Sequence, residues 1–269
     1  VNLCIPFTDS DVAWLKRYER FLRERGNSDN TMGIRFRTLR AVYNKAIEDD
    51  IVDEKYYPFK KFKVSHFNKK TTKRAISKSE MAKVLALDLS NITTYYSPLL
   101  YLSKDLFVFS YLGCGINMID MAYLTYSNII DDRICFKRHK TGQGITFRLL
   151  PQTIEIINKY KNEGYSLSDY IFPILDKKFH ITEIQQYDRI RKVTKGVNRN
   201  LKKIGSFLGL NIPLTTYVAR HSFATVLKRS GVNVAIISEA LGHTSLSTTQ
   251  FYLDSFDNEQ IDDAMKNLL

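Results

Sequence analysis

The stretch of sequence that decides the fold is Thr215-Thr216-Tyr217-Val218-Ala219-Arg220-His221-Ser222-Phe223-Ala224-Thr225, followed by Leu241-Gly242-His243 and, nine residues after that histidine, by Tyr252. Arg220 offers a forked cation, His243 a second donor and Tyr252 a hydroxyl. A phosphodiester under attack gains negative charge, so the reaction needs fixed cationic donors around an activated nucleophile. The set therefore fits a tyrosine hydroxyl that attacks a DNA phosphodiester.

These motifs resemble those of the tyrosine recombinases, also called phage-type integrases, and the resemblance covers nearly the whole chain. Arg220 matches the second arginine of that family, His243 matches the histidine of its Leu-Gly-His box, and Tyr252 keeps the nine-residue spacing of its nucleophile. Lys140 stands where the family has a hairpin lysine, which can protonate the departing 5′ oxygen. The resemblance implies a mainly α fold with a small β-sheet, in which a helical core-binding domain and a mixed α/β catalytic domain clamp DNA.

Two positions depart from the family pattern. Asn117 stands where the first catalytic arginine is expected, although the carboxylate that follows, Asp120, is retained, and Tyr217 replaces a histidine. A neutral amide cannot replace a guanidinium at a transition-state anion, and the loss would cost several kcal/mol. Asn117 then packs or caps. Arg138 is the candidate replacement, because residues two apart on a strand share a face and it should project with Lys140, about 7 Å away.

The same pattern looks like that of integrases from conjugative transposons of gut anaerobes, so we expect an active protein. Other motif residues have simpler interpretations. Tyr217 either contacts phosphate or packs under Arg220. His221 is expected to be a satisfied buried donor, His139 to face solvent or the DNA backbone, and Cys114 to be a small core residue.

The N-terminal part of the chain predicts two amphipathic helices between residues 10 and 50, with apolar positions at three- and four-residue steps. Two groups of basic residues are candidates for phosphate contacts: Arg35, Arg37, Arg40 and Lys45 on the second helix, and Lys69, Lys70, Lys73 and Arg74 after it. The second group belongs to a run from Lys60 to Arg74 that has no acidic residue. We interpret this run as an extended linker lying against phosphates, and divide the chain into a core-binding domain, 1–70, and a catalytic domain, 71–269.

The second domain is predicted to be mostly helical. A Ser77/Glu80 capping box begins its first helix, a dense apolar helix over 99–112 ends at Gly113, and alternation over 133–150 predicts a hairpin. Further helices are expected over 152–161, 189–208, 219–230 and 234–241. The tail from 256 to 269 has helical apolar spacing, and we expect it to dock onto a neighbouring protomer.

Composition agrees with a polyanionic partner. Lys and Arg number 40 against 28 acids, a formal net charge of +12. The three cysteines lack metal-ligand spacing, so we expect no zinc site, no disulfide framework and a reducing compartment, a bacterial cytoplasm, with the protein at the nucleoid. No run reaches the roughly 20 apolar residues that span a membrane. Because the first residue is Val, we expect a fragment or a processed chain, and the sequence leaves open whether a further N-terminal domain precedes it.

The resemblance implies a site-specific recombinase that integrates or excises a mobile element. Attack by Tyr252 leaves a 3′-phosphotyrosine and a free 5′-OH, and a partner strand reverses the step; since the bond energy is conserved, we expect no metal and no cofactor. The expected partners are double-stranded DNA, three further copies in a homotetramer that exchanges C-terminal helices, and accessory DNA-bending proteins. The alternatives are a type IB topoisomerase-like enzyme and a regulator that lost cleavage with the Asn117 replacement.

Overall fold

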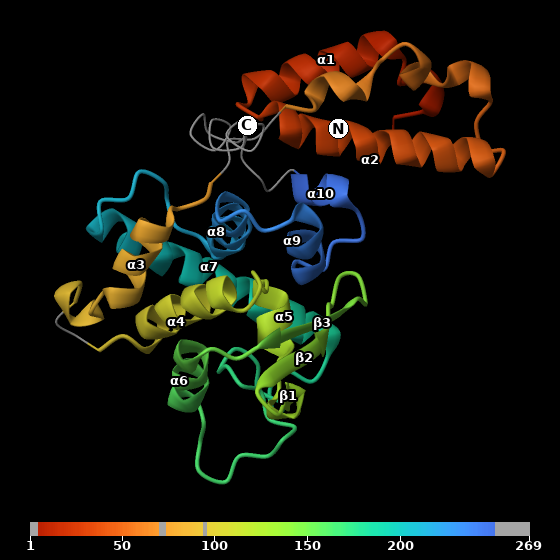
Figure 1. The fold of residues 1–269 in the computed structure, drawn as a ribbon. Helices are drawn as coiled ribbons and strands as arrows, with labels where there is room; N and C mark the ends of the chain where they lie inside the picture. Colours follow the sequence, from red (N-terminus) through yellow and green to blue (C-terminus); the bar gives the residue numbers. More distant parts are fainter. Residues whose placement is uncertain (1–4, 70–73, 94–95, 251–269) are drawn as a thin grey trace, which may run out of the picture. The chain divides into compact units, whose positions relative to one another are not determined.

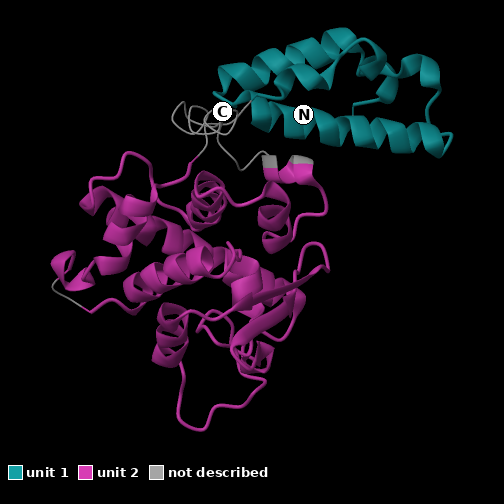
Figure 2. Ribbon diagram, in the orientation of Figure 1, with its two compact units in different colours: residues 1–72 teal, residues 73–269 magenta. Residues whose placement is uncertain are grey.

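The computed structural model describes residues 5–69, 74–93 and 96–250, and the chain divides into two compact units, residues 1–72 and 73–269 (Figure 2). Each unit has its own hydrophobic core. Tyr252, the tail from 256 to 269, Lys70 and Lys73 lie outside the described residues. The first unit is a helical hairpin with short 3-10 turns, and the second is helical around a small sheet, as the fold class predicted (Figure 1).

The first unit is built on two helices whose starts are set by side-chain caps. Helix α1, Val12–Glu24, begins where Asp11 accepts a hydrogen bond from the Trp14 amide, and α2, Asp29–Glu48, begins where Ser28 accepts from the Thr31 amide. Four 3-10 turns complete the unit: η1 Phe7–Asp9, η2 Glu54–Tyr56, η3 Pro58–Lys60 and η4 Val64–Phe67. Aromatic rings fill the core; those of Phe36 and Phe67 stack with their centroids 4.9 Å apart.

The expectation of an extended basic linker from Lys60 onward is wrong for residues 60–67. The lysines of this segment alternate with apolar residues, and Phe59, Phe62, Val64 and Phe67 are buried in the core of the first unit while the lysines stay exposed. Burying each such side chain stabilises the fold by about 1.5–3 kcal/mol. The segment therefore folds back onto α2, and the division between the units falls after Thr72.

The second unit is organised around α4, Pro98–Leu112, which is apolar on nearly every side and packs against α7, Glu183–Phe207, and α8, Thr216–Arg229. The predicted Ser77/Glu80 capping box begins α3, Lys78–Ala86, and α4 ends at Gly113 as predicted. The remaining helical elements are η5 Leu89–Asn91, α5 Met118–Tyr123, η6 Tyr126–Asn128, α6 Pro151–Lys159, α9 Val234–Ala240 and α10 Leu246–Gln250. None of the described helices is long and apolar enough to cross a membrane.

The sheet has three antiparallel strands in the order β1-β2-β3: β1 Ile129–Ile130, β2 Arg133–Lys137 and β3 Gly144–Arg148. The predicted hairpin is β2–β3, with Ile134 opposite Phe147 and Phe136 opposite Ile145. Burial of Ile134, Ile145 and Phe147 attaches the sheet to the helical core. Sequence analysis missed β1, whose two residues are too few to show an alternation.

Candidate active site

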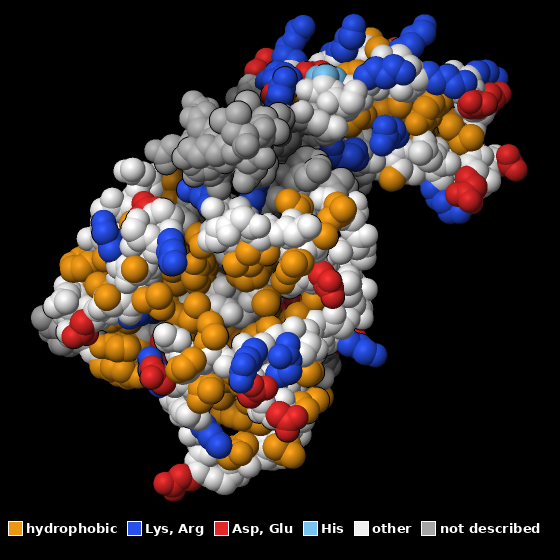
Figure 3. Space-filling view, in the orientation of Figure 1, with side chains coloured by type: hydrophobic (Ala, Val, Ile, Leu, Met, Phe, Trp, Pro, Cys, Tyr) orange, Lys and Arg blue, Asp and Glu red, His pale blue; other side chains and the backbone are white. Residues whose placement is uncertain are grey.

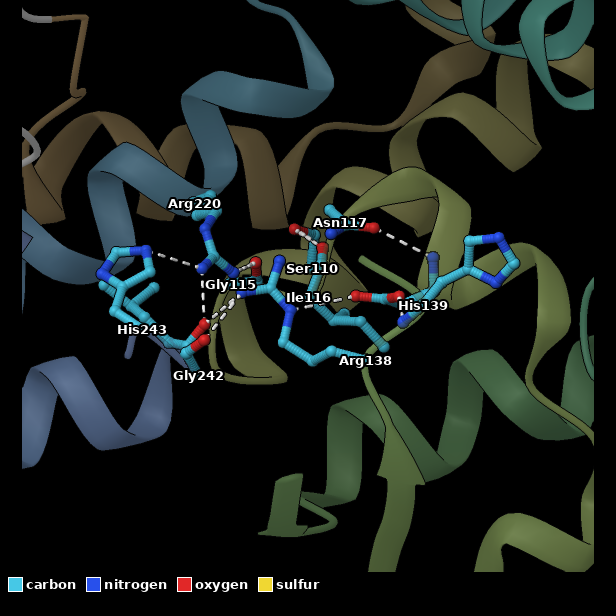
Figure 4. A network of polar contacts seen from close by, with 11 residues as sticks. Ser110, Gly115, Ile116, Asn117, Arg138, His139, Arg220, Gly242 and His243 are labelled. Carbon is cyan, nitrogen blue, oxygen red and sulfur yellow. Dashed lines mark hydrogen bonds and ion pairs between the residues drawn. The ribbon is translucent and has the colours of Figure 1, made fainter. Parts of the chain in front are cut away.

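Two buried arginines from distant parts of the chain meet at one carbonyl oxygen. Arg220 lies on α8 and Arg138 directly follows β2. Nη2 of Arg220 donates to the carbonyl of Leu241 at 2.5 Å, and Nη1 of Arg138 donates to the same oxygen at 2.7 Å (Figure 4). Their exposed fractions are only 4% and 8%. Two guanidinium groups are therefore held side by side where like charges repel, an arrangement that favours an anion between them.

Two glycines allow the arginines to lie this close. Gly242 has φ +64°, and a Cβ there would stand 2.6 Å from Cδ of Arg138. Gly115 has φ +65°, and a Cβ there would stand 3.0 Å from Cγ of Arg220, whose Nη1 donates to the Gly115 carbonyl at 2.7 Å. Left-handed backbone and close approach both require glycine at these positions. The glycine of the Leu-Gly-His motif thus makes room for Arg138.

Asp120 is the carboxylate that pairs with Arg138 in the described part of the chain. Its Oδ2 accepts from Nε of Arg138 at 3.3 Å, and its Oδ1 accepts from the amide of His139 at 2.8 Å, in surroundings that leave Asp120 3% exposed. Asp120 therefore fixes both the side chain of Arg138 and the backbone of the residue after it. The described residues include no cluster of His, Cys, Asp and Glu that could hold a metal ion.

Asn117, at the position where the family places its first arginine, is the N-cap of α5. Its side-chain oxygen accepts from the amide of Asp120 at 2.9 Å. Such a cap contributes about 1 kcal/mol to helix stability. The amide of Asn117 therefore has a structural role, and Arg138 is the second guanidinium beside Arg220.

Arg138 and Lys140 do not share one face of a strand, contrary to the prediction from sequence. Strand β2 ends at Lys137, and the amide of Arg138 already closes the turn by donating to the carbonyl of Gln143 at 2.8 Å. Lys140 lies within the turn with its side chain exposed. Arg138 reaches the site because the chain leaves the strand, and a common orientation with Lys140 no longer follows from strand geometry.

His243 completes the group around Arg220. Its Nε2 lies 3.1 Å from Nη2 of Arg220, and its Nδ1 lies 2.8 Å from Oγ1 of Thr249, which in turn donates to Oγ of Ser238 at 2.8 Å. Arg220 can only donate, so Nε2 of His243 accepts its hydrogen bond. Thr249 donates its hydroxyl proton to Ser238, so it accepts the hydrogen bond from Nδ1 of His243. His243 is therefore neutral, with its proton on Nδ1 and a lone pair on Nε2.

The surroundings of His243 favour this neutral form. Burial, followed by the charges of Arg220 and Arg138, lowers the pKa of His243 to about 4. A phosphate bound between the arginines would cancel the two charge effects and move the pKa upward. The protonation of His243 therefore depends on the charges of the two neighbouring arginines.

Tyr217 and Cys114 border the site. Tyr217 is 52% exposed in the first turn of α8, and its ring lies edge-on to that of His221 with 4.7 Å between centroids. Burial raises the pKa of the Cys114 thiol to about 11, which keeps it protonated and unreactive at neutral pH.

Sequence analysis missed a long basic groove that leads to the site. A cavity of about 1580 Å³ runs along α7 and reaches Asn117, Tyr217 and Arg220. Its basic lining residues are Arg189, Arg191, Lys192, Lys195, Arg199 and Lys202. A volume above the 300–1,000 Å³ of ordinary small-molecule sites fits a larger, anionic ligand. Basic residues at 191, 195, 199 and 202 recur at the spacing of one helix face, the signal that would have found it.

In the first unit, basic residues (blue in Figure 3) are spread over the surface. Arg35, Arg37, Arg40 and Lys45 on α2 are exposed, as are Lys69 and Arg74. Two of these side chains already have partners: Nη1 of Arg37 donates to Oδ1 of Asn68 at 2.9 Å, and Lys45 pairs with Asp49 at 2.8 Å. Apolar Ile34 and Val42, 61% and 50% exposed, lie on the same helix about two turns apart. The helix thus presents both cations and apolar groups to solvent.

Comparison with known protein families gives two matches. The phage integrase family matches residues 88–259, and the phage integrase SAM-like domain matches residues 2–64. A tyrosine recombinase of Pseudothermotoga lettingae is 28% identical over 195 residues, which are 71% of this chain and 59% of that protein. The tyrosine recombinase XerA of Thermococcus kodakarensis is 28% identical over 241 residues, 88% of this chain and 74% of that protein. A further tyrosine recombinase, from Thermosipho africanus, is matched over 43% of its length, so the chain spans only part of such relatives.

Solved structures share the fold. The Tn1549 transposon integrase, in complex with a circular intermediate DNA, superposes with a TM-score of 0.65 at 18% identity and covers 98% of this chain and 87% of that one. The XerH site-specific recombinase, bound to a palindromic difH substrate, gives a TM-score of 0.67 at 19% identity, with 95% and 71% covered. At these identities the similarity shows the fold.

Proposed function

The chain belongs to the phage integrase family, and on this premise we propose that it is a site-specific DNA recombinase that acts through a phosphotyrosine at Tyr252. The observation that carries the proposal is the pair of buried guanidiniums, Arg138 and Arg220, held on the carbonyl of Leu241. Two adjacent guanidinium groups are suited to binding a phosphodiester. Its substrate is the end of a mobile DNA element, which the recombinase integrates into a larger DNA or excises from it.

The scissile phosphate binds between the two arginines. Within the described part of the chain, the hydrogen bonds of Arg138 come from Nε and Nη1, which leaves Nη2 for a phosphate oxygen. Fixed donors that need no rearrangement stabilise the growing charge of the transition state, and one such donor is worth about 10²–10³ in rate. Arg138 thereby takes the place of the arginine that Asn117 does not supply. Asp120 holds Arg138 in place, and Tyr217 donates a hydrogen bond to the phosphate at the mouth of the site.

Proton transfers accompany the exchange of bonds. Oη of Tyr252 attacks phosphorus, the bond from phosphorus to O5′ breaks, and Lys140 gives a proton to O5′. The bound phosphate raises the pKa of neutral His243 and accepts the hydrogen bond that Nη2 of Arg220 otherwise gives to Nε2, so the Nε2 lone pair can take the proton of the phenol. In the reverse direction the 5′-OH of the partner strand attacks the phosphotyrosine and gives its proton to Lys140, the bond from phosphorus to Oη of Tyr252 breaks, and His243 returns its proton to Oη. No metal or nucleotide cofactor enters this scheme.

Duplex DNA is held by both units in this proposal. Residues 1–70 form the core-binding domain and 71–269 the catalytic domain. In the first, Arg35, Arg37, Arg40, Lys45, Lys69 and Lys70 contact phosphates, and Lys73 and Arg74 at the start of the second domain do the same. Ile34 and Val42 present the apolar surface that thymine methyl groups prefer. In the second, the groove along α7 carries the phosphates toward Arg220. The basic side chains set affinity, and the apolar ones help to set sequence preference.

The active assembly is a homotetramer on two duplexes, and its protomers are joined by exchange of their C-terminal segments. Accessory DNA-bending proteins assist it, and it acts at the nucleoid of a bacterial cytoplasm.

A strand-exchange reaction tests the function. Two labelled duplexes carrying the ends of the element should yield recombinant products with the parent protein and none with Tyr252→Phe. Relaxation of supercoiled plasmid without strand exchange would instead indicate a type IB topoisomerase-like enzyme. Tight binding with neither activity would indicate a regulator.

A further inference from the structure

His139 is anchored at both its backbone and its ring. Its amide donates to Oδ1 of Asp120 at 2.8 Å, and its imidazole stacks on the ring of Tyr123 with 4.9 Å between centroids and 8° between planes. Figure 4 shows the ring directed away from the two guanidiniums. The ring therefore does not bind the phosphate that Arg138 and Arg220 are placed to bind. His139 is exposed, so burial does not account for the orientation of its ring, and the contact with Tyr123 is what holds it.

The stack connects the β2–β3 turn to the helical core. Tyr123 is the last residue of α5, and its hydroxyl donates to Oε1 of Gln186 at 2.9 Å. Gln186 lies in the first turn of α7, and its Nε2 donates to the carbonyl of His180 at 3.0 Å. A continuous set of contacts thus runs from α7 through α5 to the residue that precedes Lys140.

The turn itself needs such support. It is closed by the bond from Arg138 to Gln143 and by one from the amide of Gly142 to the carbonyl of Arg138 at 2.8 Å, with Gly142 at φ +68°. The side chain of Lys140 is exposed and has four rotatable bonds. A proton donor on a loosely held turn spends little time near its acceptor, and misplacement by about 1 Å can cost 10²-fold in rate.

We propose that His139 is a positioning residue, whose stack on Tyr123 holds the β2–β3 turn so that Lys140 can deliver its proton to the leaving 5′ oxygen. The inference rests on the proposed function, because it concerns the general acid of that reaction. The imidazole acts as a flat surface and exchanges no proton itself. A planar ring without nitrogen should therefore replace it.

The test compares two substrates. One is a nicked suicide duplex with an ordinary phosphodiester, and the other carries sulfur in place of the bridging 5′ oxygen, which leaves without needing a proton. Single-turnover cleavage is measured for the parent, His139→Ala, His139→Phe, Lys140→Ala and the double variant His139→Ala/Lys140→Ala. Thermal melts and DNA binding of each variant are recorded in parallel.

The expected pattern is specific. His139→Ala should slow cleavage of the oxygen substrate about tenfold, the upper range for a stacked aromatic pair, and leave the sulfur substrate within about twofold of the parent. His139→Phe should recover most of the oxygen rate, and His139→Ala should add nothing to Lys140→Ala. Equal slowing of both substrates, failure of His139→Phe to recover, or an unchanged oxygen rate would each overturn the inference. If the parent forms no adduct with either substrate, the proposed function fails first.

Discussion

Replacing Arg138 by methionine separates its two expected roles, in catalysis and in stability. Methionine keeps much of the length of the side chain and removes its charge. Because Nη2 of Arg138 is directed to phosphate in the proposed mechanism, single-turnover cleavage should fall by about 10²–10³, the range for losing one fixed donor to a transition-state anion. An exposed arginine of strand β2, Arg133, supplies the matched control, and Arg133→Met should cleave at the parent rate.

The same change should destabilise the fold, and the structure gives the reason. Asp120 is 3% exposed and would lose its ion partner, keeping the hydrogen bond from the amide of His139. Removing one member of a buried pair costs about 3–5 kcal/mol. At about 2–4 °C per kcal/mol for a domain of this size, the midpoint of thermal unfolding should fall by on the order of 10 °C.

A second substitution distinguishes the roles. In the double variant Arg138→Met/Asp120→Asn the buried charge is gone, so most of the thermal stability should return while cleavage stays slow. Adduct formation is measured at a temperature at which every variant is folded. If the double variant recovers cleavage together with stability, Arg138 only supports the fold. If Arg138→Met alone cleaves at the parent rate, the replacement of the missing arginine is refuted.

Three further predictions follow from the site and from α2. The pKa of His243 is about 4 in the folded protein and about 6.5 in the unfolded chain, so between these pH values the unfolded chain binds one more proton. The free energy of unfolding should therefore fall as the pH drops from about 6.5 to about 4. After allowance for solvent screening, the loss is on the order of 2 kcal/mol. Melts of the parent and of His243→Asn across this range should differ in slope, and parallel curves would contradict the assignment. Gly242→Ala, which brings a Cβ within 2.6 Å of a neighbouring arginine carbon at φ +64°, should cost on the order of 2 kcal/mol or more and slow cleavage; an unaffected variant would show that the close approach is unimportant. On α2, Arg40→Ala should weaken binding to all DNA sequences equally and reduce the slope of log affinity against log salt concentration by about the value for one phosphate contact. The double variant Ile34→Ala/Val42→Ala should weaken binding to the cognate site and leave that slope unchanged. Titrations on cognate and random duplexes at several salt concentrations measure both effects, and a slope that Arg40→Ala leaves unchanged would contradict the phosphate contact.

Motif spacing predicted that His243 lies near Arg220, because one helix and one glycine turn are enough to bring the two side chains together. Arg220 lies on α8, and the backbone turn at Gly242 brings His243 to within 3.1 Å of it. Such contacts depend on a helix, a glycine and a short connection, all of which leave a signal in sequence. The part of the motif that supplies Tyr252 lies outside the described residues, so its role as nucleophile stays a prediction.

Arg138 shows what sequence alone could not supply. It was selected because strand alternation placed it beside Lys140, but β2 ends one residue before it. Its position depends on contacts with Asp120 and with the carbonyls of Leu241 and Gly242, between 18 and 104 residues away in sequence. No local pattern encodes the contacts with Leu241 and Gly242, which lie more than 100 residues away.

Residues 60–67 after α2 were predicted to be an extended linker because of their lysines, but the apolar residues that alternate with these lysines determine the structure. Lysines there drew attention to phosphates, while Phe59, Phe62 and Phe67 between them belong to the core. The start of α7 was placed too late for a related reason: Ile184 and Tyr187 are 75% and 61% exposed, so the first turns lack a buried stripe, although the Thr182 capping box marks the start.

Covalent capture of DNA tests the central claim most directly. The parent and Tyr252→Phe are incubated, without divalent metal, with nicked DNA carrying the end of the element that encodes the chain, and the products are separated on a denaturing gel. The account predicts a protein–DNA adduct from the parent and none from Tyr252→Phe. An adduct that persists in Tyr252→Phe, or a parent that binds this DNA tightly and forms no adduct, would contradict it.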